Sequence, residues 1–369
     1  MKTGDSSALW HVGLDLPRGA LFAAIVASVM FGAAGASQSA DSAGDKWPGP
    51  TTPAKAPKDI KVGIIPCGVQ FRGCNAPALG AAEAAKALGW TVTAYDGAGT
   101  QEKQNTGILD ALSSGANLVL TTALDPNFIQ LGLSKAKEAN VPVVSSSAGT
   151  DSPNPVLKPE GEGLKYVTDV GTDFGGVGRG LGDFVVKESG GKANVVVYED
   201  DEFPSAVTSL KAFVDVVKTC PGCKVSDIVK MTASQIGSVG QMVVGYLQTH
   251  PDVDWIYAPY DPAAAVMVNA VVQAGLQDKV KLVSIVGSAQ NIDFIREGKV
   301  QAADGAFDNF YMGWAQVDQA IRVLNKQPLI EPNDEGTPYA IITKDNLPPP
   351  GGEYSTNVDY RSKFMSLWK

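Results

Sequence analysis

The sequence has 369 residues, of which 44 % are hydrophobic and 19 % are charged, an ordinary composition for a globular protein. Its 30 basic and 39 acidic residues give a net charge of -9. This balance excludes nucleic acid as the main partner, because neutralising phosphates requires clustered Lys and Arg, and it is typical of a dispersed monomer. The length predicts more than one folding unit, since domains usually span about 100–200 residues.

The N-terminal segment predicts export from the cytoplasm. Residues 20–36 read ALFAAIVASVMFGAAGA and end in Ala34-Gly35-Ala36, an A-x-A cleavage pattern. We expect residues 1–36 to be a signal peptide, so that the mature protein is periplasmic or secreted. An uncleaved membrane anchor is the alternative, because spanning a bilayer needs about 17–25 residues. Residues 37–58 are rich in Pro, Gly, Ala and Ser and predict a flexible N-terminal tail.

From Asp59 onward, short β-branched runs alternate with helical patterns, and Gly or Pro marks most junctions. The expected strands cover residues 60–65, 91–95, 118–121, 141–145, 166–170, 193–198, 225–229, 255–258, 282–286, 301–306 and 339–342. The expected helices cover residues 77–88, 101–114, 126–139, 174–189, 205–217, 238–249, 262–274, 291–297 and 309–324. This alternation predicts an α/β fold with doubly wound parallel sheets in two lobes, and ligands of such sheets bind beyond the carboxyl ends of the strands.

The four cysteines form two pairs that lie close together in the sequence. An even number of cysteines in an exported chain predicts disulfides, here Cys67–Cys74 and Cys220–Cys223. A redox-active Cys-Pro-Gly-Cys motif is the alternative for the second pair. A zinc site is disfavoured because the mature chain keeps only His250 as a further ligand.

Motifs for catalysis or cofactor binding are incomplete in this sequence. There is no G-x-S-x-G elbow, and the Gly-rich run over residues 175–182 lacks the G-x-G-x-x-G spacing. The acidic run over residues 200–202 lacks the spaced ligands of a calcium loop. We therefore expect neither enzymatic activity nor a cofactor nor a metal ion, and we expect the Gly-rich run to begin a helix and to allow close packing of the lobes.

Several ordered segments together resemble a known protein family. The segments are Asp59–Ile65, Gly80–Gly89, Asp96–Asn105, Gly115–Leu120, Ala139–Val144 and His250–Ala258. In this order they resemble the type I periplasmic solute-binding proteins of ABC importers, in the ribose- and galactose-binding class. The resemblance covers residues 59–343.

The resemblance implies two lobes joined by a three-strand hinge near residues 171–172, 306–308 and 338–340. The N-terminal lobe would comprise residues 59–171 with 308–338, and the C-terminal lobe residues 172–307 with 339–369. Such proteins close on a small ligand, usually a sugar or polyol, and deliver it to an ABC permease without a cofactor. Sensing for a membrane receptor or for chemotaxis, and a secreted α/β enzyme, are the alternative functions.

The sequence departs from the family where ribose-type proteins bind sugar hydroxyls. An Asp-Arg pair, a second Arg, an Asn, an Asp and a Gln of the family correspond here to Ser147-Ala148, Val207, Tyr260, Ala289 and Ala306. Those side chains make charge-assisted hydrogen bonds to pyranose hydroxyls. We therefore expect a less charged, more aromatic pocket, whose ligand is a sugar, a polyol or a less polar compound.

The candidate ligand-binding residues follow strand ends that face the expected cleft. They are Gln70, Phe71, Arg72 and Ser147 in the first lobe, Phe203, Tyr260, Asp261 and Ser288 in the second, and Phe307 and Asp308 at the hinge. Two of them have a structural alternative. Phe71 would pack under the Cys67–Cys74 loop, and Asp261, which precedes Pro262, would cap a helix.

Overall fold

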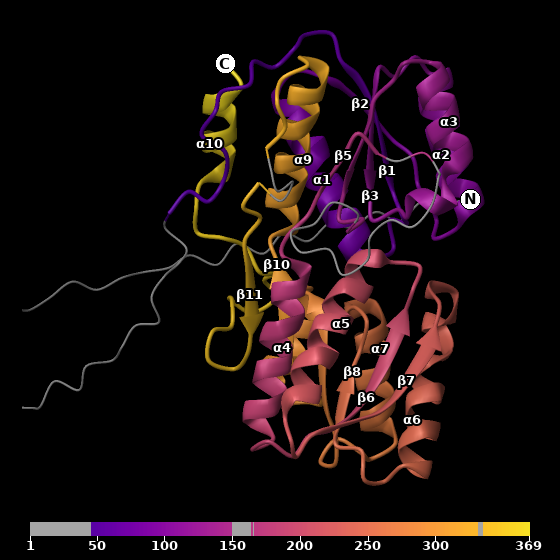
Figure 1. The fold of residues 1–369 in the computed structure, drawn as a ribbon, viewed down its shortest axis with the longest axis vertical. Helices are drawn as coiled ribbons and strands as arrows, with labels where there is room; N and C mark the ends of the chain where they lie inside the picture. Colours follow the sequence, from indigo (N-terminus) through magenta and orange to yellow (C-terminus); the bar gives the residue numbers. More distant parts are fainter. Residues whose placement is uncertain (1–45, 150–163, 165, 331–334) are drawn as a thin grey trace, which may run out of the picture. The chain divides into compact units, whose positions relative to one another are not determined.

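The computed structural model describes residues 46–149, 164, 166–330 and 335–369 (Figure 1). The expected signal peptide and residues 37–45 of the expected tail lie outside the described residues. Within the described part of the chain, no helix combines the length and apolar character needed to cross a membrane.

The first lobe is built on a sheet of five parallel strands in the order β2-β1-β3-β4-β5. The strands are β1 (Lys61–Pro66), β2 (Thr91–Ala94), β3 (Leu118–Thr122), β4 (Val143–Ser146) and β5 (Thr168–Val170). Strands β3, β4 and β5 are buried at every position. This burial is expected for parallel strands covered by helices on both faces.

The helices of this lobe are α1 (Arg72–Ala87), α2 (Gln101–Ser113), α3 (Gln130–Glu138) and α9 (Asn309–Leu324). Helix α1 packs against α9, and α2 packs against α3 (Figure 1). Small residues allow the first contact, because a Cβ atom on Gly80 would lie 2.5 Å from the carbonyl oxygen of Phe310. The helix expected over residues 126–139 is divided into a short 3-10 helix, η1 (Pro126–Phe128), and α3.

The second lobe is built on a sheet of six strands in the order β11-β10-β9-β8-β6-β7. The strands are β6 (Asn194–Asp200), β7 (Lys224–Met231), β8 (Trp255–Tyr257), β9 (Lys281–Val286), β10 (Gln301–Phe307) and β11 (Tyr339–Ile342). All neighbours are parallel except β10 and β11. The antiparallel pair differs from the expected all-parallel sheet. It arises because the chain leaves the sheet at the end of β10, forms α9 in the first lobe, and re-enters the sheet as β11 from that same end.

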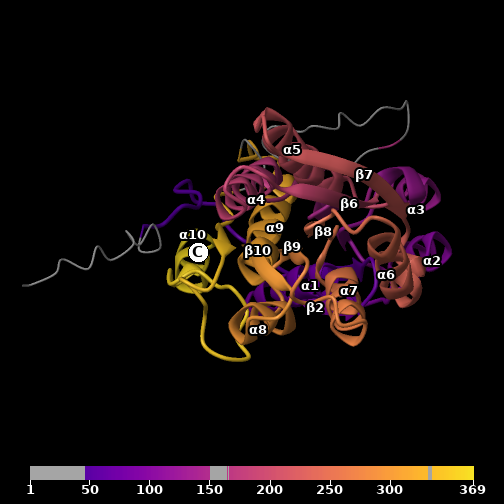
Figure 2. The ribbon, with the colours of Figure 1, turned by 90° about the horizontal axis from the view of Figure 1, so that it is seen from below.

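The helices of the second lobe are α4 (Phe174–Glu188), α5 (Pro204–Thr219), the 3-10 helix η2 (Ala233–Ser238), α6 (Val239–Thr249), α7 (Asp261–Gln273) and α8 (Ala289–Glu297). Helices α4 and α5 lie side by side (Figure 2). The Gly-rich run explains this contact, since a Cβ atom on Gly182 would lie 2.7 Å from Cβ of Val216. The run lies in the first half of α4, as expected, but these two helices belong to the same lobe, so this contact is not the expected packing between the lobes.

The chain crosses from one lobe to the other at three places. It passes between β5 and α4, between β10 and α9, and between α9 and β11. These places match the three crossings that the family resemblance implies. Each crossing connects a strand of one lobe to an element of the other.

The C-terminal segment departs from the expected domain division. Helix α10 (Tyr360–Leu367), which the sequence analysis does not identify, packs on α9 of the first lobe (Figure 1). Trp368 stacks on Trp314 with ring centroids 5.5 Å apart, and its Nε1 donates to Oδ1 of Asp318 at 2.5 Å. Residues 339–369 therefore do not all belong to the second lobe, because their last aromatic residues are buried against α9.

The described part of the expected flexible tail is held in place. The amides of Ala54 and Ala56 donate to the carbonyls of Leu367 and Trp368. Arg322 donates to the carbonyl of Thr52 at 2.8 Å. The expectation of a free tail fails for residues 46–58, because these polar backbone contacts and the burial of Ala54 attach the segment to α9 and α10.

Candidate ligand-binding site

A pocket is lined by residues of both lobes. It is partly open to solvent. The first lobe contributes Phe71, Gly73, Cys74, Ala123 and Ser147. The second lobe contributes Phe174, Phe203, Ser205, Ala206, Ala233, Tyr260, Pro262, Ile285, Val286 and Phe307. Many of these residues follow strands at their carboxyl ends, where α/β sheets bind ligands.

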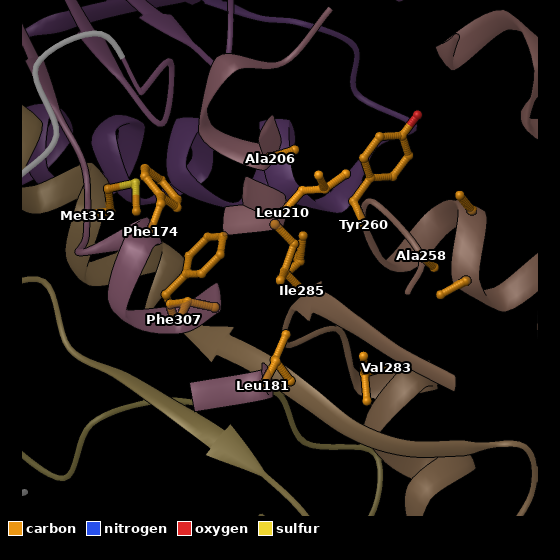
Figure 3. Close-up of a cluster of buried hydrophobic side chains, with 14 of the residues drawn as sticks. Phe174, Leu181, Ala206, Leu210, Ala258, Tyr260, Val283, Ile285, Phe307 and Met312 are labelled. Atoms are coloured by element: carbon orange, nitrogen blue, oxygen red, sulfur yellow. The ribbon is translucent and has the colours of Figure 1, made fainter. Parts of the chain in front are cut away.

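Aromatic rings form two pairs in this pocket. Phe203 and Tyr260 meet edge to face with centroids 5.6 Å apart, and Phe174 and Phe307 do so at 5.5 Å. Figure 3 shows the rings of Phe174 and Phe307 pointing toward each other beside Met312. Such edge-to-face contacts fix ring orientation. The rings therefore give the pocket a preformed apolar surface.

The hydroxyl of Tyr260 donates a hydrogen bond to Oδ2 of Asp200 at 2.7 Å. Asp200 ends β6 and is 1 % exposed, and its Oδ1 accepts the backbone N–H of Glu202 at 3.0 Å. Burial raises the pKa of Asp200 to about 6, although the Tyr260 hydrogen bond opposes this shift. The carboxyl group holds the Tyr260 ring at the pocket wall and does not itself line the pocket.

Three lining residues have left-handed or strained backbone conformations. Ala123 follows β3 with φ of 55°, and Ser147 follows β4 with φ of 60°. Val286, at the end of β9, has φ of 128°, which is costly for a β-branched residue. The amide of Ser147 donates to the carbonyl of Val170 at 2.7 Å and helps to hold its turn. Strain of this kind collects at functional sites.

A buried carboxyl pair supports the loop after β9. Oδ2 of Asp261 accepts the amide of Ser288 at 2.6 Å, and Oδ1 of Asp304 accepts the amide of Gly287 at 3.0 Å. Ser284 Oγ donates to Asp261 Oδ1 at 2.6 Å. Burial and the nearby Asp261 carboxylate raise the pKa of Asp304 well above its usual range. The pair therefore positions the loop that follows Val286.

Five of the ten predicted site residues line this pocket. They are Phe71, Ser147, Phe203, Tyr260 and Phe307. Four of the five are aromatic, and none of the five carries a charge.

The structure does not place the other five predicted residues in the pocket lining. Gln70 is exposed. Arg72 makes a bidentate ion pair with Glu353 at 2.6 and 2.7 Å. Asp261 and the amide of Ser288 bond to each other in the network beneath the loop.

Asp308 is the fifth residue outside the lining. It caps α9 by accepting the amide of Tyr311 at 2.9 Å, and it also accepts Ser355 Oγ at 3.0 Å. The alternative of a helix cap is wrong for Asp261, because Tyr260 is the N-cap residue of α7 and the Asp261 carboxylate accepts Ser284 Oγ and the amide of Ser288. A capping role describes Asp308 instead. Sequence position alone does not distinguish such carboxylates from ligand-binding ones.

Sequence reasoning misses several lining residues. Ala123, Ile285 and Val286 lie at strand ends, so a consistent use of the strand-end rule identifies them. Phe174 follows the first crossing, where an aromatic residue at a helix start is a second usable signal. Ala206 gives no such signal, since small apolar residues are common in helices.

Both predicted disulfides are present. Cys67 pairs with Cys74 and Cys220 pairs with Cys223, with Cα–Cα distances of 5.5 and 5.3 Å. The first bridge borders the pocket through Cys74. Among the described residues, no group of His, Cys, Asp and Glu side chains is arranged to hold a metal ion.

Comparison with solved structures places the fold among solute-binding proteins. A solute-binding protein of an ABC transporter from Mycobacterium smegmatis with bound glycerol has a TM-score of 0.68 and 22 % identity, covering 81 % of this chain and 98 % of its own. The Caulobacter myo-inositol-binding protein bound to myo-inositol has a TM-score of 0.66 and 20 % identity, covering 82 % and 97 %. A protein from Agrobacterium vitis bound with alpha-D-tagatopyranose has a TM-score of 0.69 and 17 % identity, covering 79 % and 97 %.

Comparison by sequence gives the family. No curated protein matches the chain at a significant level. The family model described as the periplasmic binding protein domain matches residues 62–328, which is most of the chain. With its two α/β lobes and parallel sheets, the chain belongs to the periplasmic binding protein domain family and has the type I fold.

Proposed function

We propose that this protein captures a small ligand in the pocket between its lobes and delivers it to an ABC permease. The observation that carries the proposal is the composition of the pocket lining, which draws residues from the strand ends of both sheets. A ligand in this pocket touches Phe71 and Ser147 on one side and Tyr260 and Ile285 on the other.

The proposed mechanism is capture by closure of the lobes. Contacts from both lobes exist together only when the lobes are close, so the ligand shifts the population toward that state. The three crossings are the positions at which backbone rotation would accommodate the movement. A permease that recognises the closed form then receives loaded protein in preference to free protein.

The first ligands to consider are sugars and polyols. Structural relatives contain glycerol, myo-inositol and a tagatopyranose. The aromatic lining of this chain adds less polar compounds to the candidates.

Binding without turnover is part of the proposal. The two serines of the described lining, Ser147 and Ser205, have no His or carboxylate beside them in that lining. Such a partner is needed to activate a serine nucleophile. We therefore assign the pocket a binding role only.

Export and a monomeric state complete the proposal. The Ala34-Gly35-Ala36 pattern supports cleavage after residue 36, and two disulfides support an oxidising compartment. N-terminal sequencing of the exported protein tests the cleavage, and an N-terminus at Met1 contradicts it. Light scattering during gel filtration tests the monomer.

A thermal-shift screen over sugars, polyols and small ring compounds tests the capture. A true ligand raises the melting temperature, and the increase grows with the ratio of its concentration to its Kd. Solution scattering with the identified compound should show a smaller radius of gyration. Deleting the gene should then abolish uptake of that compound. Intact uptake with lost chemotaxis would instead indicate sensing for a receptor, and the absence of any stabilising compound would contradict capture.

A further inference from the structure

Few of the residues that line the pocket have side chains that can form hydrogen bonds. Of the described residues that line it, only Ser147, Ser205 and Tyr260 carry a polar side-chain atom other than sulfur, and none carries a charge. The Tyr260 hydroxyl already donates a hydrogen bond to Asp200. The lining therefore presents two serine hydroxyls and one tyrosine oxygen to a ligand, against an otherwise apolar wall.

A polyhydroxylated ring fits this lining poorly. A pyranose or an inositol carries several hydroxyls on its ring edge, and each one needs a partner once water is removed. A hydroxyl buried without a partner weakens binding by roughly tenfold or more. Three side-chain oxygens cannot serve such a ring, whereas they match one or two polar substituents.

A smaller pocket adjoins the first, and its lining indicates which polar group of a ligand it would accept. It shares Ala123, Phe203 and Ala233 with the main pocket. Its other lining residues include the carboxylates Asp125 and Glu202. Each carboxylate already accepts one backbone N–H, from Asn127 and Ala233 respectively, at 2.8 Å, and retains further acceptor capacity.

The charge around both pockets is one-sided. No Lys or Arg lines either of them among the described residues. Arg72, the one cationic residue among the candidates from the sequence, is paired with Glu353. A ligand with a carboxylate or phosphate would meet two negative groups and no positive partner. A ligand with a donating hydroxyl finds acceptors instead.

From these observations we infer that the ligand is an uncharged compound with one largely apolar ring and one or two hydroxyl groups. The ring lies among Phe71, Phe203, Tyr260 and Phe307, and a hydroxyl points toward Asp125 and Glu202. This inference rests on the proposed capture function and narrows it from small solutes in general to weakly polar ring alcohols or phenols.

Saturation-transfer NMR on the exported protein tests this ligand class with matched probes. Cyclohexanol, cyclohexane-1,2-diol and myo-inositol share a six-carbon ring and carry one, two and six hydroxyls. Phenol and benzoate share an aromatic ring and differ in charge. Each probe is measured with the wild-type protein, with Tyr260→Ala, and with Tyr246→Ala. Tyr246 stacks on His250 at the end of α6 and serves as the control outside the pocket.

We expect transfer to cyclohexanol, the diol and phenol that is lost in Tyr260→Ala and kept in Tyr246→Ala. Myo-inositol and benzoate should bind at least tenfold more weakly than cyclohexanol and phenol. If myo-inositol binds more tightly than cyclohexanol, and this binding needs Tyr260, the ligand class is wrong while capture in the pocket stands. If benzoate binds as well as phenol, the charge argument is wrong. If none of the probes binds in a Tyr260-dependent way, the inference is overturned, and a wider screen that also finds nothing overturns capture itself.

Discussion

The hydroxyl of Tyr260 lies 2.7 Å from Oδ2 of Asp200, so a residue at the start of α7 is joined to the end of β6. The same ring meets Phe203 edge to face. The contact satisfies one oxygen of a carboxyl group that is removed from water. It also fixes the tyrosine ring at the pocket wall. The same contact therefore affects both the stability of the fold and the shape of the proposed ligand pocket.

Removing the Tyr260 hydroxyl should destabilise the protein. In Tyr260→Phe the ring remains, but Oδ2 of Asp200 loses its donor while it stays buried, which costs about 1–3 kcal/mol. Urea denaturation at pH 7 measures the change in the free energy of unfolding. Tyr246→Phe is the matched control and should change it little. Equal stability of the two variants would show that water replaces the lost donor.

The raised pKa of Asp200 makes stability depend on pH. Between about pH 4 and pH 6 the folded state keeps a proton on Asp200 that the unfolded state has released. Stability from this group is therefore greatest at low pH and falls as pH rises through this window. The whole effect is about 3 kcal/mol, from about two pKa units at roughly 1.4 kcal/mol each.

Asp200→Asn removes this dependence and keeps an acceptor for Tyr260. Denaturation curves from pH 4 to pH 7 should show the stability of the wild type falling relative to the variant. A constant difference across this range contradicts the raised pKa. The comparison with the variant is needed because burial also raises the pKa of Asp261, Asp304 and Asp308.

The two disulfides should differ in their effect on binding. Removing Cys67–Cys74 or Cys220–Cys223 by double substitution to Ala costs about 2 kcal/mol each, because both bridges close short loops. Only Cys74 lines the pocket. We therefore expect weaker ligand binding after loss of the first bridge and unchanged binding after loss of the second. A calorimetric titration of both variants measures their affinities. Equal affinities would show that the Cys67–Cys74 bridge does not contribute to binding.

The attachment of the C-terminal segment depends on a buried ion pair. Asp318 accepts Nε of Arg322 at 2.6 Å and Nε1 of Trp368 at 2.5 Å, and both charged side chains are almost fully buried. Asp318→Ala leaves the Arg322 charge without its partner and should cost about 3–5 kcal/mol. Thermal unfolding measures the loss. An exposed pair gives the control: Glu138→Ala, which breaks the contact with Lys135, should change the stability little, because solvent screens this pair.

The sequence predicts the alternating elements well because their signals are local. Apolar β-branched runs such as residues 118–121 and Gly stops such as Gly115 report strand and helix ends directly. Helix α10 escapes notice because it is short, half of its eight residues are polar, and only Tyr360 and Phe364 are buried. Its position depends on contacts with α9, which are distant in sequence.

The site is only half predictable for a similar reason. Aromatic residues at strand ends, such as Tyr260 and Phe307, point to the pocket because packing at turns rarely explains them. Carboxylates at the same ends are ambiguous. Asp261 and Asp308 accept the backbone amides of Ser288 and Thr356, which approach only after folding, and no local pattern reveals those partners.

The most direct test of the account is a calorimetric titration of the compound identified by screening into three proteins: the wild type, Tyr260→Ala and Tyr246→Ala. If the pocket between the lobes holds the ligand, Tyr260→Ala weakens binding by about 2 kcal/mol, roughly 30-fold. Tyr246→Ala then binds like the wild type. The same affinity in all three proteins would contradict the assignment of this pocket as the binding site.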